Sequence, residues 1–173
     1  MMSTISTDVP SRAFGIAATV PDPEMPMLTL LDLGVLREVR QDADGTVIVT
    51  ITPTYSGCPA MATMRADLEH ALTAAGFDRV QVQTSLAPAW SSDWITDTGW
   101  RKLRRHGIAP ADPVRPQPSG PVPLTLIPRR PRVQCPQCDS FETEQTSEFG
   151  PTPCTSTYRC TRCGEPFNRI KEH

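Results

Sequence analysis

Apolar residues fall at every second position in the stretch 46–52, where Val47, Val49 and Ile51 share one parity. This period of two is typical of a β-strand, and Pro53 ends the strand because proline donates no hydrogen bond to a sheet. Residues 35–40 precede it and are separated from it by an Asp44-Gly45 turn signal. The pattern therefore predicts an antiparallel hairpin made of residues 35–40 and 46–52.

A helical period follows the hairpin. The apolar positions recur at steps of three and four, as expected for one face of a helix from Pro59 to about Ala75, with Gly76 ending it; they are Met61, Met64, Leu68, Leu72 and Ala75. Other segments predict a first helix starting near Asp8 and covering 11–20, a third strand at 79–86, and a last helix from 91 to 107. The resulting order of helix, strand, strand, helix, strand, helix indicates a small α+β domain.

The distribution of prolines predicts that the chain has two domains. The 173 residues include 19 prolines, and many of these gather in 109–132, which predicts an extended linker between a domain at 1–108 and a second at 133–173. The net charge of −2 gives no general attraction to nucleic acid. No apolar run is long enough for a membrane span, and no export signal begins the chain, so we expect a cytoplasmic protein.

The second domain contains two Cys-x-x-Cys pairs, Cys135 with Cys138 and Cys160 with Cys163. A short hairpin between the pairs would let four thiolates hold one Zn²⁺, as in a zinc ribbon, and the ion would stabilise a segment too small to fold by apolar burial. An iron-sulfur cluster or a redox-active dithiol uses the same residues. Cys154 is extra, and we interpret it as a buried core thiol, with a ligand role left open if the metal is iron-sulfur.

The first domain has one cysteine, Cys58, placed where the strand pattern stops and the helical pattern begins. Unpaired N–H groups and the helix dipole at that point favour a thiolate. The upstream loop carries Asp22 and Glu24, which would ordinarily cap a turn. The chain contains no phosphate-binding glycine loop, nucleophile elbow or carboxylate-bridged diiron motif, so we expect an accessory component rather than a self-sufficient catalyst.

Two runs resemble a known family: Asp22-Pro23-Glu24-Met25-Pro26-Met27-Leu28-Thr29-Leu30-Leu31-Asp32-Leu33-Gly34-Val35-Leu36 and Thr52-Pro53-Thr54-Tyr55-Ser56-Gly57-Cys58-Pro59-Ala60. They are similar to the PaaD or PaaJ family of bacterial phenylacetyl-CoA epoxidase components, and the likeness extends to the cysteine pairs. The Asp-Pro-Glu loop and the Cys-Pro step also resemble the SufT-like iron-sulfur assembly family. The resemblance implies an accessory subunit in aerobic phenylacetate degradation that assists maturation or assembly of an iron or iron-sulfur centre.

The resemblance further implies that Cys58, with Asp22 and Glu24, engages a transient iron or iron-sulfur species. Cys58 alone cannot hold a cluster, so the remaining ligands would come from a partner, a small thiol or a homodimer. The implied partners are the diiron oxygenase component or the 2Fe-2S reductase. A purely structural adaptor between oxygenase subunits, without metal transfer, is the alternative, and nucleic-acid binding by the ribbon is disfavoured by the overall charge.

Overall fold

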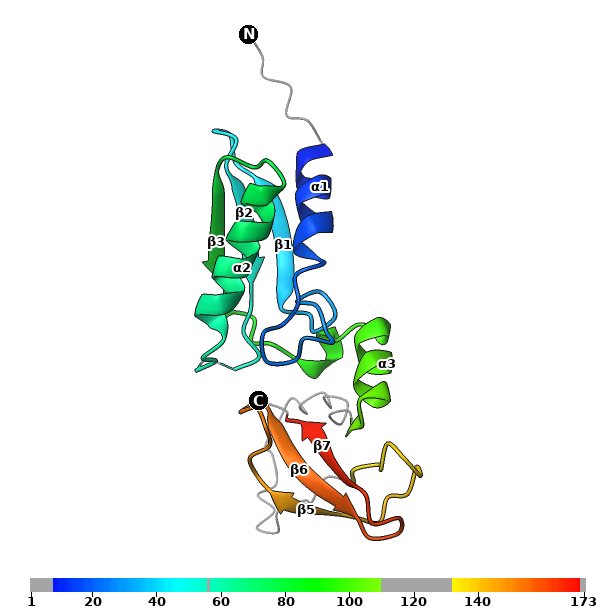
Figure 1. The fold of residues 1–173 in the computed structure, drawn as a ribbon. Helices are drawn as coiled ribbons and strands as arrows, with labels where there is room; N and C mark the ends of the chain where they lie inside the picture. The colour runs from blue at the N-terminus through cyan, green and yellow to red at the C-terminus, as the bar shows by residue number, and fades with distance from the viewer. Residues whose placement is uncertain (1–7, 56, 110–131, 172–173) are drawn as a thin grey trace, which may run out of the picture. The chain divides into compact units, whose positions relative to one another are not determined.

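The computed structural model of the protein describes residues 8–55, 57–109 and 132–171, which belong to two compact units divided between Lys102 and Leu103. Figure 1 shows helices and a sheet in the N-terminal unit and a sheet in the C-terminal unit. The predicted α+β class is confirmed. The predicted linker falls mostly on 110–131, outside the described residues, and the domain limits of 1–108, 109–132 and 133–173 stay a prediction.

The N-terminal sheet contains β1 (Leu36–Gln41), β2 (Val47–Ile51) and β3 (Val80–Thr84), in the order β1-β2-β3. β1 and β2 are antiparallel, which confirms the predicted hairpin, and β3 runs parallel to β2. Val49 and Val82 are paired in register and buried on the same face. Because β2 and β3 are parallel, the loops that follow them leave the same end of the sheet.

Two helices pack on this sheet, α1 (Asp8–Ala17) along β1 and α2 (Met61–Ala74) along β3, and they contact each other (Figure 1). The apolar stripe predicted for α2 is confirmed, because Met64, Leu68 and Leu72 are buried. α1 ends at Ala17 and α2 begins at Met61, so Val20 and Pro59 lie in turns outside the helices predicted to include them. Within the described part of the chain, none of the helices has the length and apolar character that a membrane crossing requires.

The single helix predicted for 91–107 is wrong in one respect, because the structure divides it into a 3₁₀ turn, η1 (Ser92–Trp94), and α3 (Asp97–Arg105). Each has its own cap: Ser91 Oγ accepts from Asp93 N at 3.2 Å, and Thr96 Oγ1 accepts from Gly99 N at 3.0 Å. Two side-chain caps five residues apart specify two short helical segments rather than one.

The C-terminal unit contains a four-stranded sheet in the order β4-β7-β6-β5. Its strands are β4 (Ile108–Ala109), β5 (Thr143–Ser147), β6 (Thr155–Cys160) and β7 (Pro166–Ile170). The antiparallel β5-β6 pair is the hairpin predicted between the cysteine pairs. Its core is small and includes two of the cysteines; the buried members are Ala109, Val133, Cys135, Tyr158, Cys160 and Phe167.

Candidate functional site

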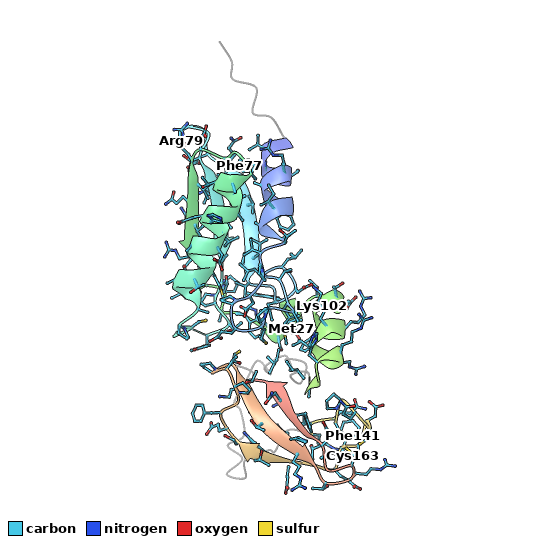
Figure 2. All side chains as sticks on the ribbon, viewed as in Figure 1. Met27, Phe77, Arg79, Lys102, Phe141 and Cys163 are labelled. Carbon is cyan, nitrogen blue, oxygen red and sulfur yellow. The ribbon has the colours of Figure 1, made fainter. Side chains whose placement is uncertain are left out.

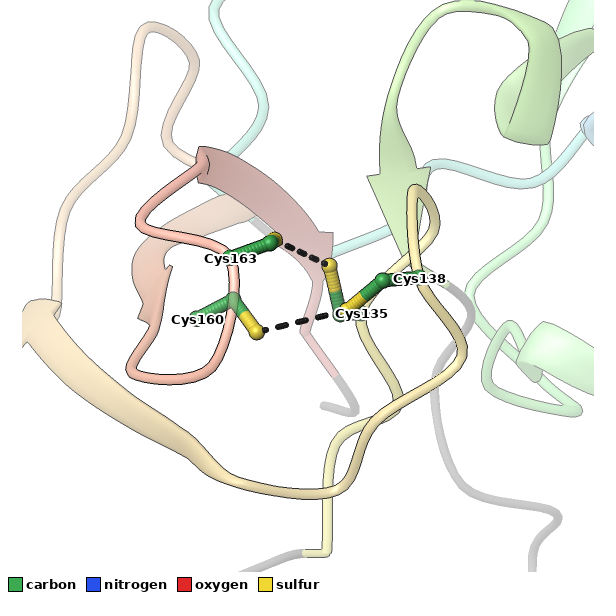
Figure 3. Close-up of side chains that lie close together, drawn as sticks. All are labelled: Cys135, Cys138, Cys160 and Cys163. Atoms are coloured by element: carbon green, nitrogen blue, oxygen red, sulfur yellow. Dashed lines mark hydrogen bonds between the residues drawn. The ribbon is translucent and has the colours of Figure 1, made fainter.

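The four paired cysteines form one cluster at the end of the β5-β6 hairpin (Figure 3). Their sulfur atoms all lie within 4.8 Å of one another. Cys135 Sγ is 3.8 Å from Cys163 Sγ, and Cys138 Sγ is 3.6 Å from Cys160 Sγ. A zinc ion bound tetrahedrally at a Zn–S distance of about 2.3 Å requires sulfurs about 3.8 Å apart. The cluster therefore has the dimensions of a tetrathiolate site for one ion.

The backbone of the two Cys-x-x-Cys turns repeats the same hydrogen bonds. Asp139 N donates to Cys135 O at 3.0 Å, and Gly164 N donates to Cys160 O at 2.9 Å. Both residues have positive φ, 57° for Asp139 and 80° for Gly164, because each turn must reverse directly after its second cysteine. Glycine adopts this conformation freely and aspartate tolerates it. Two equivalent turns therefore present their sulfurs to a common centre.

The chemistry of the cluster also suits zinc. Backbone N–H groups of Cys163 and Arg162 lower the pKa of Cys160 to about 7, so this sulfur readily becomes the thiolate that binds metal. Although backbone N–H groups oppose the shift, burial and neighbouring sulfurs raise the pKa values of Cys138 and Cys163, so metal binding at these two positions has to displace a proton. Four cysteines would fill all four positions of a tetrahedral ion and leave none for a substrate, so a zinc ion held here would be structural. Cys154 is buried but stands outside the cluster, with Thr152 Oγ1 at 3.2 Å from its sulfur.

The second candidate site lies in the N-terminal unit, where Cys58 follows β2 and precedes α2. The residue is nearly buried, and its carbonyl oxygen accepts from Met61 N at 3.5 Å. The helix N-cap is Ala60 rather than Cys58, so the cysteine stands two residues before the cap. The predicted strand-to-helix position is close, but the sequence placed the thiol nearer the first helical turn than it is.

Asp22 and Glu24 lie on the loop between α1 and β1. The Asp22 carboxylate is buried, and its Oδ1 accepts from Met25 N at 2.7 Å and from Glu24 N at 2.9 Å. Asp22 therefore caps a turn, as the residues by themselves had suggested. Burial raises the pKa of Asp22, although these two N–H groups oppose the shift. Burial, followed by repulsion from Asp22, also raises the pKa of Glu24, which is half-buried.

Cys58, Asp22 and Glu24 influence one another electrostatically. Burial raises the pKa of Cys58 first of all, and the carboxylates of Glu24 and Asp22 add to the increase. The N–H groups of Ala60 and Met61 lower that pKa, as predicted for a helix N-terminus, but their effect is smaller. The prediction of a favoured thiolate is therefore wrong, because burial and two nearby carboxylates outweigh the helix. Among the described residues, only the four ribbon cysteines gather closely enough to hold an ion as a preformed set.

One interaction in the N-terminal unit, an ion pair between Asp32 and Lys102, was not predicted from the sequence. Asp32 is buried, and its Oδ2 accepts from Lys102 Nζ at 2.5 Å and from Thr29 N at 3.0 Å. The pKa of Asp32 is lowered: burial alone would raise it, but the bonds from Lys102 and Thr29 prevail. Lys102 lies at the same end as Met27, while Phe77 and Arg79 lie at the other end (Figure 2). No periodicity in the sequence links Asp32 with Lys102, because the two residues are 70 positions apart.

Comparison with known families gives a separate match for each of the two candidate sites. Residues 18–84, which include Asp22, Glu24 and Cys58, match the family model described as "Iron-sulfur cluster assembly protein". Residues 119–171, which include the four clustered cysteines, match the model described as "PaaD zinc beta ribbon domain". The two family matches thus give the chain an iron-sulfur-assembly domain followed by a zinc ribbon domain.

Individual relatives identify the family within this class of proteins. The chain is 41% identical over 170 residues, 98% of its length and 97% of the relative, to the putative D component of the 1,2-phenylacetyl-CoA epoxidase of Escherichia coli (strain K12). The chain belongs to this PaaD family of epoxidase subunits. It is also 33% identical over 86 residues, 49% of its length and 81% of the relative, to the "Fe-S protein maturation auxiliary factor" of Porphyromonas gingivalis.

A solved structure supports the fold alone. A domain of unknown function, DUF59, from Bacillus anthracis superposes with a TM-score of 0.53 at 21% identity, over 58% of this chain and 97% of that chain.

Proposed function

We propose that this chain is an accessory subunit of a phenylacetyl-CoA epoxidase and assists the maturation or assembly of an iron or iron-sulfur centre carried by another subunit. The observation that carries the proposal is that Cys58 lies near enough to the carboxylates of Glu24 and Asp22 to interact with them electrostatically, inside the segment similar to iron-sulfur assembly proteins. In this proposal the ribbon cysteines hold structural zinc, and the iron species is cargo rather than a resident cofactor. The partner is the diiron oxygenase component or the 2Fe-2S reductase.

The raised pKa of Cys58 fits a transient ligand better than a permanent one. At neutral pH the sulfur keeps its proton, so a metal can bind only by displacing that proton. The sulfur–hydrogen bond breaks, a sulfur–metal bond forms, and the proton passes to water. Proton return to Cys58 then favours release of the metal to a partner with better ligands.

The experiment measures iron delivery directly. The full-length chain, purified without oxygen and loaded with Fe²⁺, is mixed with iron-free oxygenase component, and iron in the re-isolated component is measured. We expect Cys58→Ser to reduce the transfer rate at least about tenfold, since a hydroxyl is a poor soft-metal ligand. Cys154→Ser is the matched control, because it removes a buried thiol from the other unit and should transfer iron normally.

The structural adaptor remains the second candidate function, favoured by one observation. Asp22 already satisfies two backbone N–H groups as a turn cap, a role that needs no metal. If Cys58→Ser folds normally and transfers iron at the rate of the unchanged chain, the adaptor replaces the maturation proposal.

A further inference from the structure

The end of the N-terminal sheet that carries Cys58 is free of charge over long stretches. No charged residue occurs between Gly45 and Arg65, and none occurs between Arg79 and Asp93, although charged residues make up 21% of the chain. These two stretches contain β2 and β3 and the loops that follow them. Ser85 N donates to Ile51 O at 2.9 Å, so the two loops start side by side.

The loop after β3 exposes apolar side chains. Leu86 is 60% exposed, the largest exposed fraction of a large apolar residue among the described part of the N-terminal unit. Ala87, Pro88 and Ala89 follow it and are exposed as well. Ser85 Oγ donates to Ala87 O at 2.8 Å, which holds the turn that presents them. A run of four exposed uncharged residues on a braced loop has no evident role in folding.

Exposed prolines also stand on the other two loops at this end of the sheet, where Leu36 of β1 pairs with Ile51 of β2. Pro59 stands next to Cys58, and Pro21, Pro23 and Pro26 stand on the loop of Asp22 and Glu24. Proline side chains are already rigid, so burying them against another molecule costs little conformational entropy. Depletion of charge around an apolar patch is also the composition found at the centre of protein interfaces. We define the Cys58 surface as the exposed residues Leu86–Ala89, Pro59 and the three loop prolines.

We propose that the Cys58 surface is the docking surface for a partner protein whose own apolar rim surrounds a positively charged centre. The proposal rests on the proposed function and adds where the partner binds. It assigns partner binding to the N-terminal unit.

The negative charge at this surface favours binding of such a partner over binding of a second copy of this chain. A symmetric pair would bring the half-buried Glu24 carboxylates of both copies, each beside a buried Asp22, together in a surface emptied of water. Like charges at short range destabilise one another. Within one copy, burial and then repulsion from Asp22 already raise the pKa of Glu24. A cationic centre in the partner would instead be attracted to Glu24 and Asp22. The surface is therefore complementary to a different protein and not to itself.

The test uses the full-length chain with its zinc and, as the probe, the purified oxygenase component of a 1,2-phenylacetyl-CoA epoxidase. Equilibrium binding is measured without added iron, so that affinity is separated from metal transfer. We expect Leu86→Asp to raise the dissociation constant at least about tenfold, because it places a charge in the apolar centre of the interface. Leu86→Met preserves the apolar character and should stay within about threefold.

Phe149→Asp is the matched control, because Phe149 is 70% exposed but belongs to the C-terminal unit. This variant should bind like the unchanged chain. Equal binding by Leu86→Asp and the unchanged chain, or no measurable binding by the unchanged chain, would overturn the proposal. A dimer in sedimentation experiments that Leu86→Asp dissociates would overturn it as well, because the surface would then belong to a second copy.

The two proposals fail in different ways. Iron transfer that needs Cys58 but survives Leu86→Asp would reject the docking surface and leave the maturation function standing. Binding that needs Leu86, together with iron transfer unaffected by Cys58→Ser, would keep the docking surface and reject maturation. Loss of binding in Leu86→Asp with normal binding but lost transfer in Cys58→Ser would support both.

Discussion

The two cysteine sites of this protein differ in whether they offer a complete set of metal ligands. In the ribbon, four thiols from two equivalent turns lie within 4.8 Å of one another, so one ion can satisfy them all. In the N-terminal unit, one thiol has two carboxylates near enough to raise its pKa, but the three groups do not converge as a preformed metal site. A complete set of ligands serves stability, because it holds its ion permanently. An incomplete set has to be completed by another molecule, which is what a carrier requires.

The largest expected effect comes from breaking the complete site. Cys160→Ser removes one of four thiolates, and structural zinc contributes on the order of 10 kcal/mol or more to the folding of such small units. We expect zinc to be lost and the core around Tyr158 and Phe167 to open. Zinc analysis and amide hydrogen exchange would detect this as lost protection in β6 and β7 with protection retained in β2.

The control for this experiment is a cysteine in the same unit. Cys154→Ser alters a buried thiol that stands outside the cluster, so zinc and protection should both be retained. If Cys160→Ser kept its zinc, the tetrathiolate assignment would be wrong. If it lost zinc but kept protection in β6 and β7, the apolar core would be folding the ribbon without the metal.

An intermediate effect is expected from Asp32, which holds its part of the N-terminal unit by a partly buried ion pair instead of a metal. Asp32→Asn removes the charge that accepts from Lys102, and we expect the free energy of unfolding at pH 7 to fall by about 2 kcal/mol. The folded pKa of Asp32 is below its ordinary value of 3.8, so its contribution is present above that value and is lost as pH falls through the folded pKa.

Urea unfolding at pH 7 and near pH 3 checks both the size and the sign of this effect. The difference between the unchanged chain and Asp32→Asn should shrink at the lower pH, and a constant difference would mean that packing, not charge, is responsible. Asp42→Asn is the control, because Asp42 and Arg40 form an exposed ion pair with side chains 55% and 43% exposed. Such pairs contribute less than about 1 kcal/mol.

The sequence predicted what depends on local spacing and missed what depends on distant contacts. The β1-β2 hairpin, the apolar stripe of α2 and the four-cysteine cluster all follow from residues a few positions apart. The division of the last helix has a local signal in the sequence, Thr96 before Asp97. The Asp32–Lys102 pair had none, because it joins a loop to a helix across 70 positions.

The raised pKa of Cys58 is the clearest example of a property set by the fold. Its helix-start position was readable from the chain, and the expected N–H groups of Ala60 and Met61 do lower the pKa. Burial and the loop of Asp22 and Glu24 reverse the outcome, and neither can be seen from spacing around position 58. Local sequence gives the position of a reactive group more reliably than its protonation state, because charges from distant segments decide the latter.

The smallest expected effect comes from a substitution that tests why the pKa of Cys58 is raised instead of lowered. Glu24→Gln removes a negative charge that raises the pKa of the thiol, so the thiolate fraction at neutral pH should increase. We expect the rate of Cys58 alkylation by iodoacetamide at pH 7.5 to rise about two- to fivefold, since the thiolate is the reacting form. Peptide mass spectrometry of the zinc-loaded chain measures Cys58 and Cys154 separately in one sample.

Cys154 is an internal control in that experiment, because its unit contains neither Glu24 nor Asp22 and its rate should not change. Added salt should reduce the difference between Glu24→Gln and the unchanged chain, because Glu24 is only half-buried and its charge is partly screened. A rate that rises equally for both cysteines would indicate general loosening of the protein. A slower Cys58 reaction in Glu24→Gln would mean that Glu24 assists deprotonation as a base, and the carboxylate would then promote metal binding rather than protect the thiol.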